Sequence, residues 1–313
     1  MTATIQTRAL IDVLIERLLD GYIFPERAAV AARVLWKQHR AGAYPAAARP
    51  ELCKQLTADL QRATDDKHLR LIWHESSADS QDDSQLIGAL RERFRLENHG
   101  VRRVDLMSGN VGLLELTAIP ELAAAAPTLT AAMLLVQHTE ALIIDLRPTL
   151  GGSPDAVTFL SSFLFPDGET RLSDIVEGPD GPARQFWTAD YLPGPRYLGR
   201  PVYALTGPKT FSGGESFAYD LQALGRATIV GEPTGGGAHP SQVVCLAEHI
   251  ELFLPTARPV SPITGGNWEG VGVQPDIRVP AADALAVAHR EALDVIENKF
   301  SNPGDRSETK ARA

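Results

Sequence analysis

The sequence is poor in cysteine, and this limits the kinds of site it can build. Only two of its 313 residues are cysteines, Cys53 and Cys245, and they lie far apart with no CxxC spacing. A disulfide framework or a cysteine-based metal site needs more sulfur ligands than this. We interpret the pair as two buried thiols, and a single disulfide between them is the alternative.

Positive charge and long apolar runs are also scarce. Lys and Arg number 30 against 39 Asp and Glu, which gives a net charge of -9. Such a surface repels a phosphate backbone and gives no attraction to anionic lipid, so we expect no nucleic-acid partner. No apolar run approaches the roughly 18 residues of a membrane span, and the N-terminus lacks the basic and apolar regions of a signal peptide. We therefore expect a cytoplasmic protein.

Apolar spacing divides the chain into a helical part and a mixed part. Helical periodicity is found near residues 5–20, from Pro25 onward and near 50–63, and a strand is expected within 65–75. From residue 101, short apolar runs alternate with helical stretches, which is typical of an α/β domain. The predicted strands lie at 111–116, 141–145, 202–205, 228–230, 243–246 and 250–254, and the predicted helices at 121–138, 153–165, 214–224 and 282–299. The predicted domains are a three-helix domain at 1–75, a polar linker at 76–100, an α/β core at 101–300 and a flexible tail at 301–313.

One serine stands at the junction of a predicted strand and a predicted helix. Ser212 is followed by two glycines and then by Glu215. A serine there can present its hydroxyl beside unpaired helix amides, which favour a developing negative charge. The alternative is purely structural, because a serine followed three residues later by glutamate is also a capping box.

Two glycine-rich turns follow other predicted strands. In the first, Gly151 and Gly152 let the backbone approach a ligand closely, so an amide there could stabilise an oxyanion. The alternative is a tight turn. The second loop, 231–240, ends in His239, and without a Gly-Lys-Ser/Thr run it is not a phosphate-binding Walker loop. His239 is a candidate base, although a flexible turn explains the loop equally well.

Two further polar residues complete the candidates. His68 lies in DDKHL, between the helical part and the core, and Glu269 lies among glycines in NWEGVG. Taken alone, a histidine beside charged residues is usually solvated, and an isolated loop glutamate is usually a surface acid.

In this order, the segments resemble the superfamily of the tail-specific (C-terminal processing) proteases, the tricorn core protease and the interphotoreceptor retinoid-binding protein. The bacterial proteins similar to that retinoid-binding protein are the closest match. The resemblance spans nearly the whole chain, and its most specific stretches are DLRPTLGGSPD, TFSGGESFAYDLQALGRATIVGEPTGGGAHP and NWEGVGVQPDI. It implies a crotonase-like (ClpP/crotonase) α/β core with an N-terminal helical domain. It also implies Ser212 as nucleophile and the amides of Gly152 and Gly213 as oxyanion donors.

The departures from the superfamily pattern indicate which variant this chain resembles. Tail-specific proteases carry a lysine base in the loop after the nucleophile, where this chain has Gly237, so a Ser–Lys dyad is excluded. The tricorn-type arrangement instead implies His68 as base and Glu269 as its partner. The residue before that histidine is Lys67 here, where the tricorn pattern has an assisting serine. Residues 76–100 leave no room for the usual PDZ domain.

We therefore expect a serine-type peptidase or related acyl hydrolase with a Ser212–His68–Glu269 site, with His239 as the reserve base. The alternatives are a non-catalytic carrier of a hydrophobic small ligand, and an enzyme that processes a small acyl compound. The expected partner is a peptide or small acyl substrate, with homo-oligomers left open. No metal or organic cofactor is implied.

Overall fold

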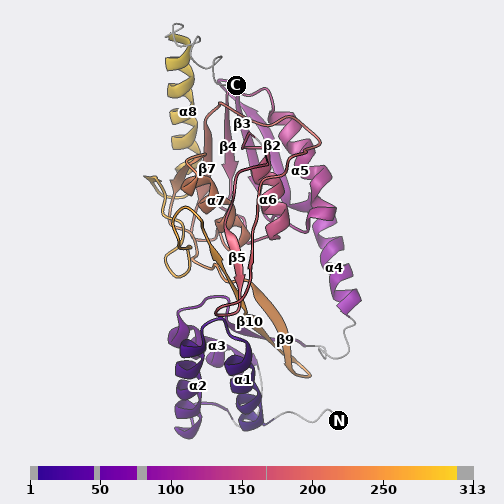
Figure 1. The fold of residues 1–313 in the computed structure, drawn as a ribbon, viewed down its shortest axis with the longest axis vertical. Coiled ribbons are helices and arrows are strands. Elements are labelled where there is room, and N and C mark those ends of the chain that lie inside the picture. Colours follow the sequence, from indigo (N-terminus) through magenta and orange to yellow (C-terminus); the bar gives the residue numbers. More distant parts are fainter. Residues whose placement is uncertain (1–5, 46–49, 76–82, 167, 302–313) are drawn as a thin grey trace. The chain divides into compact units, whose positions relative to one another are not determined.

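A computed structural model of the chain describes residues 6–45, 50–75, 83–166 and 168–301 (Figure 1). The helices are α1 Thr7–Gly21, α2 Pro25–Arg40, α3 Pro50–Thr64, α4 Asp83–Leu96, the short η2 Asn98–Gly100, α5 Leu122–Val136, α6 Pro154–Ser162, α7 Gly213–Ala223 and α8 Ala284–Ser301. The strands are β1 Arg70–Trp73, β2 Val101–Met107, β3 Val111–Leu116, β4 Ala141–Asp145, β5 Asp174–Glu177, β6 Ala183–Arg184, β7 Val202–Thr206, β8 Thr228–Gly231, β9 Ser241–Ala247, β10 Ile250–Pro255, β11 Ala257–Val260 and β12 Ile277–Arg278.

The chain forms two compact units, and each is built from separate stretches of sequence. The first unit contains residues 1–93, 172–186 and 236–272, and the second contains the stretches between and after them. The chain therefore leaves the first unit and returns to it twice.

The first unit holds three helices against a small antiparallel sheet. In α1, Leu10, Leu14 and Leu18 recur every four residues and are fully buried, so one face of the helix packs inward. They share a core with α2, α3 and with apolar residues of the sheet β1-β10-β9, whose strands pair antiparallel. A second small sheet, β11-β5-β6, belongs to the same unit.

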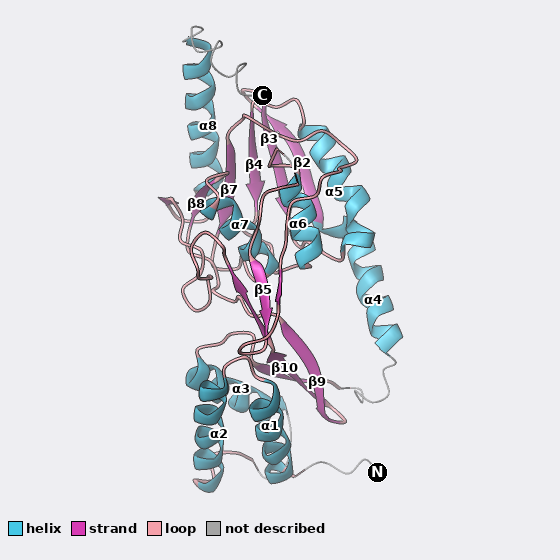
Figure 2. Cartoon of the chain, in the orientation of Figure 1, coloured by secondary structure: helices cyan, strands magenta, loops and turns pink. Residues whose placement is uncertain are grey.

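The second unit is built on a six-stranded sheet in the order β12-β8-β7-β4-β3-β2. Only the β2–β3 pair is antiparallel, and all other neighbours run parallel. Every residue of β4 and β7 is buried, as expected of parallel strands covered on both faces. Alanines of α8 pack on the face that carries Ile143 and Leu205, and Figure 2 shows α5 and α6 on the other side of the sheet.

The parallel strands bring two loops to one edge of this sheet. Because the carboxyl ends of neighbouring parallel strands meet at the same edge, the turn after β4 and the turn after β7 are adjacent. The Phe211 amide donates a hydrogen bond of 3.0 Å to the Thr149 carbonyl, and the Thr210 hydroxyl donates one of 2.8 Å to the Leu146 carbonyl. These bonds hold the two turns side by side.

The predicted α/β pattern is confirmed, with two kinds of departure. β3 and β4 have the predicted bounds, and the other predicted helices and strands are present within a few residues. β2 was not among the predicted strands, and neither were β5, β6 and β11, which are short and pair only with one another. Residues 76–82 of the predicted linker and 302–313 of the predicted tail lie outside the described residues, while α4 occupies part of the linker.

The prediction of two buried thiols is half wrong. Cys53 is buried on α3, but Cys245 is exposed on β9, and no disulfide joins them. In β9 the exposed Cys245 stands between the half-buried Val244 and the buried Leu246, so its exposure follows from its position on the strand rather than from residue type.

No helix within the described part of the chain has the length and apolar character needed to cross a membrane.

Candidate active site

Ser212 has a backbone conformation that serine rarely adopts. Its φ of 51° and ψ of -117° match the first central position of a type II′ turn, where glycine dominates. It stands between β7 and α7, as the residue immediately before the helix. A backbone conformation of this kind costs a non-glycine residue free energy, and such strained residues cluster at active sites.

Glu215 holds this turn in place. Its side chain is fully buried, and its Oε2 accepts a hydrogen bond of 2.8 Å from the Ser212 amide. Its Oε1 accepts the Thr234 hydroxyl, which ties the turn to the loop after β8. Glu215, which was predicted as part of a capping box, thus fixes the backbone of Ser212 through the Ser212 amide.

The two predicted oxyanion donors, Gly152 and Gly213, are adjacent in the second unit. A Cβ atom placed on Gly213 would lie 2.5 Å from the Gly152 nitrogen, and one placed on Gly151 would lie 3.4 Å from the Ser212 Cβ. Gly213 is the first residue of α7, so its N–H is one of those that the helix itself cannot pair. The backbones of the two glycines are therefore packed so closely beside Ser212 that neither position has room for a Cβ atom.

The polar pair Asp145 and Arg147, at the exit of β4, has a structural role. Arg147 donates to both oxygens of Asp145, at 2.9 and 2.6 Å, and to the Ala281 carbonyl at 2.6 Å. The side-chain hydrogen bonds with Asp145 raise the pKa of Arg147. The pair fixes the exit of β4 from which the glycine turn begins.

A second polar cluster belongs to the first unit and is centred on Asp66. This carboxylate is fully buried and accepts three hydrogen bonds: 2.9 Å from the Tyr22 hydroxyl, 2.8 Å from His239 Nδ1, and 3.0 Å from the His68 amide. Burial acts to raise the pKa of Asp66, but the hydrogen bond and charge of His239 and the other donors outweigh it and lower the pKa. Asp66 is therefore an ionised anchor for both histidines.

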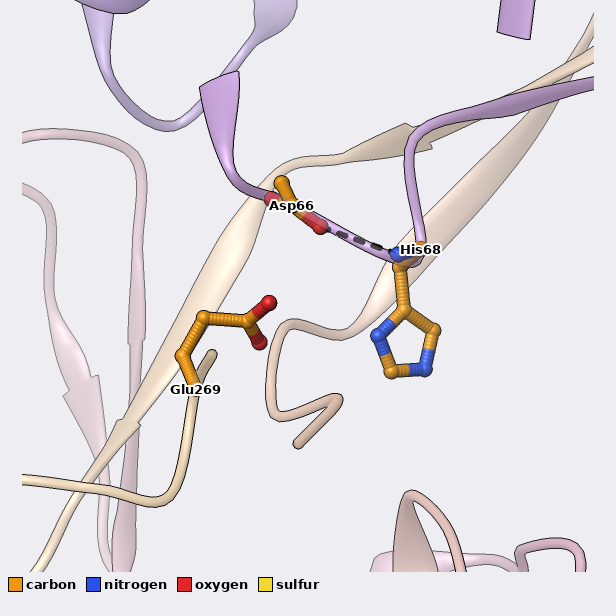
Figure 3. Close-up of side chains that lie close together, drawn as sticks. All are labelled: Asp66, His68 and Glu269. Atoms are coloured by element: carbon orange, nitrogen blue, oxygen red, sulfur yellow. Dashed lines mark hydrogen bonds between the residues drawn. The ribbon is translucent and has the colours of Figure 1, made fainter. Parts of the chain in front are cut away.

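His68 and Glu269 lie beside Asp66 (Figure 3). One ligand atom from each of the three residues lies within 4.8 Å of the others. Glu269 Oε2 accepts the Ala238 amide and is 3.5 Å from His239 Nδ1. Burial lowers the pKa of His68 to about 4 and raises the pKa of Glu269. His68 is thus a neutral imidazole at physiological pH, which is the form a general base requires.

The predicted site residues therefore fall into two groups. Ser212, Gly152 and Gly213 are together in the second unit, and His68, His239 and Glu269 are together in the first. Sequence reasoning missed Asp66, which the DDKH segment offers only as one of two adjacent acids. It also missed Tyr22, whose hydroxyl meets Asp66 across 44 positions of sequence with no local signal.

Sequence models of known families cover most of the chain. The model of peptidase family S41 matches residues 110–279, and that of the N-terminal domain of family S41 peptidases in eukaryotic IRBP matches residues 2–95. The chain belongs to peptidase family S41. Family membership makes it a serine-type peptidase whose substrates are peptides, and it confirms the predicted superfamily.

Solved structures agree on the fold. A candidate peptidase from Parabacteroides merdae superposes with a TM-score of 0.66 at 16% identity, over 92% of this chain and 97% of that one. Mature CPAF gives 0.59 at 14%, over 96% and 98%. The photosystem II D1 C-terminal processing protease gives 0.51 at 15%, over 88% and 94%. At these identities the likeness establishes the fold alone. Between β1 and β2 the described residues form only α4 and η2, so no PDZ domain is seen there.

Proposed function

We propose that Ser212 is the nucleophile of this peptidase, that His68 is its base and that Glu269 orients the resulting imidazolium. The observation that carries the proposal is the backbone of Ser212, whose φ of 51° is costly for any residue except glycine. Ser212 also forms a capping box with Glu215, but glycine would adopt the φ of this turn at lower cost, so a serine here favours a role for its hydroxyl.

In this mechanism His68 takes the proton of the Ser212 hydroxyl as the serine oxygen attacks the carbonyl carbon of the scissile peptide. The carbonyl oxygen becomes an oxyanion, and the amides of Gly152 and Gly213 donate hydrogen bonds to it. His68 then gives its proton to the leaving amine. Water hydrolyses the acyl-enzyme by the same steps, with His68 again acting as base. No metal or organic cofactor takes part.

The choice between the two histidines rests on their partners. His239 is 2% exposed, and its Nδ1 is engaged by Asp66. A catalytic base is commonly oriented by an acid in this way, and for that reason His239 is kept as the reserve base. We favour His68, because burial keeps its imidazole neutral and Glu269 lies beside it to stabilise the charged form. In this proposal Asp66 and His239 position the His68 segment.

Several finer features belong to the same proposal. The histidine base and the segment between β1 and β2, where no PDZ domain is seen, support a tricorn-like peptidase over a lysine-dependent tail-specific one. The proposed working division is a helical domain at 1–75 and a catalytic core at 101–300, in a cytoplasmic protein. Small acyl substrates and homo-oligomers are compatible with this proposal.

Labelling with a fluorophosphonate probe tests the assignment directly, because the probe reacts only with an activated serine. We expect the wild-type chain to be labelled, Ser212→Ala to be inert, and His68→Gln to lose at least about 100-fold in labelling rate. Ser216→Ala is the matched control, since Ser216 lies one turn further along α7. It should be labelled like wild type.

Other labelling patterns would redirect or overturn the assignment. A greater loss in His239→Gln than in His68→Gln would move the base to His239. Labelling of a folded Ser212→Ala chain at the wild-type rate would remove Ser212 as nucleophile. A folded wild type that takes no label would favour the hydrophobic-ligand carrier.

A further inference from the structure

Asp66, His68 and Glu269 have the composition of a metal site as well as that of a catalytic cluster. They bring one imidazole and two carboxylates together, with ligand atoms within 4.8 Å of one another. Imidazole nitrogen and carboxylate oxygen are ligands that Zn²⁺ accepts readily, whereas Ca²⁺ and Mg²⁺ prefer oxygen alone. Such a cluster is not a site by its composition alone, so a second observation is needed.

That observation is an unsatisfied oxygen on Glu269. Its side chain is only 10% exposed, and within the described residues its buried Oε1 makes no hydrogen bond. Its other oxygen, Oε2, accepts the Ala238 amide. Figure 3 shows the carboxylate directed toward the space between Asp66 and the His68 ring. A buried carboxylate oxygen without a donor is costly, and a cation would satisfy it.

The surroundings already orient these ligands. Asp66 is held by the Tyr22 hydroxyl and His239 Nδ1, and the carboxylate of Glu269 is held through Oε2 by the Ala238 amide. Outer hydrogen bonds of this kind fix ligand orientation in metal sites. Tetrahedral zinc ligands stand about 3.4 Å apart, for metal–ligand distances of about 2.1 Å. The ligand atoms of Asp66, His68 and Glu269 lie within 4.8 Å of one another, so small side-chain rotations would have to bring them to the spacing of zinc ligands.

We propose that Asp66, His68 and Glu269 bind one Zn²⁺ ion, and that this ion inhibits the peptidase reversibly. Neutral imidazole has one basic nitrogen at a time, so an ion bound to the His68 nitrogen that faces Glu269 leaves the proton on the other nitrogen, which then cannot accept the proton of Ser212. Zinc is thus an inhibitor here and supplies no chemistry to the reaction. The inhibitory half of the proposal rests on the proposed function, whereas the binding half does not.

Isothermal titration calorimetry with ZnCl₂ tests the site without reference to activity. The full-length chain should bind one ion, and Ser212→Ala should bind it equally well. His68→Gln and Glu269→Gln should each bind at least about 10-fold more weakly. The matched control is His74→Gln, because His74 Nε2 pairs with Glu251 at 2.8 Å elsewhere in the same unit. It should bind like wild type. Co²⁺ provides a second readout, since a four-coordinate cobalt complex has visible absorption that the same two variants should lose.

Labelling with the fluorophosphonate then tests inhibition. Wild-type labelling should fall as the zinc site fills and return on addition of a chelator, and His74→Gln should behave identically. Absence of stoichiometric binding, or binding unchanged in folded His68→Gln and Glu269→Gln, overturns the site. Binding without any fall in labelling overturns the inhibition. If wild type takes no label even without zinc, the proposed function and the inhibition fail together, while calorimetry still decides the site.

Discussion

Replacing Ser212 by glycine should stabilise the protein relative to replacing it by alanine. Both variants lose the hydroxyl, so their difference isolates the backbone. Alanine keeps the strain of a φ of 51° and a ψ of -117°, which costs a non-glycine residue about 1–3 kcal/mol. Glycine relieves this strain but loses about 0.5–1 kcal/mol through its freer unfolded chain. We expect a net advantage of about 1 kcal/mol for Ser212→Gly over Ser212→Ala.

Thermal unfolding measures this difference. For a domain of about 150–250 residues, 1 kcal/mol corresponds to about 2–4 °C in Tm. The control is the same pair of substitutions at Ser216, inside α7, where glycine should be about 1 kcal/mol less stable than alanine. Opposite signs at the two positions would support stored strain at Ser212. A Tm of Ser212→Gly equal to or lower than that of Ser212→Ala would refute the inference that the backbone of Ser212 is strained.

The remaining predictions concern the supports of the same site. Glu215→Ala removes a buried acceptor of the Ser212 amide, so we expect it to lower the free energy of unfolding by about 2–4 kcal/mol, measured by urea denaturation, with Glu215→Gln milder. Gly213→Ala would place a Cβ atom 2.5 Å from the Gly152 nitrogen, so fluorophosphonate labelling should fall at least about 10-fold; an unchanged rate would contradict the proposed amide geometry. The third prediction concerns pH. Burial lowers the pKa of His68 to about 4, so the labelling rate should stay level down to about pH 5 and halve near pH 4; a midpoint near 6.5 would exclude His68 as the buried base. Between about pH 4 and 6.5, His68 binds fewer protons in the folded state than in the unfolded state. The free energy of unfolding should therefore fall by about 3 kcal/mol as the pH falls through this range. Tm measurements on His68→Gln should not show this loss.

The strands at the centre of the sheet could be predicted because the residues of each strand themselves indicate that it is buried. β4 and β7 are continuous apolar runs that end at polar or glycine-rich turns, and a strand covered on both faces needs such a run. β5, β6 and β11 have no comparable signal. β11 pairs with β5 across about 80 residues of sequence, and that pairing depends on how the chain returns to the first unit rather than on local propensity.

The candidate site divides in the same way. Ser212, Gly152 and Gly213 stand in turns whose glycines mark close backbone approach, so their motif was visible in the sequence. The role of Glu215 was only half visible, because the capping pattern predicts its bond to the Ser212 amide but not its bond to Thr234. Asp66 was not singled out at all, since an acid beside another acid and a lysine is ordinarily solvated.

The sequence by itself determined the alternation of strands and helices, the family, and the serine and glycines of the turn that carries Ser212. All of these depend on spacings within a few residues. Only the tertiary structure decided which acid forms a hydrogen bond with which histidine. Asp66 meets His239 across 173 positions and Tyr22 across 44. Such pairings arise because distant segments pack into one buried cluster, where an ionised carboxylate must find donors, and no local pattern encodes which donors will be there.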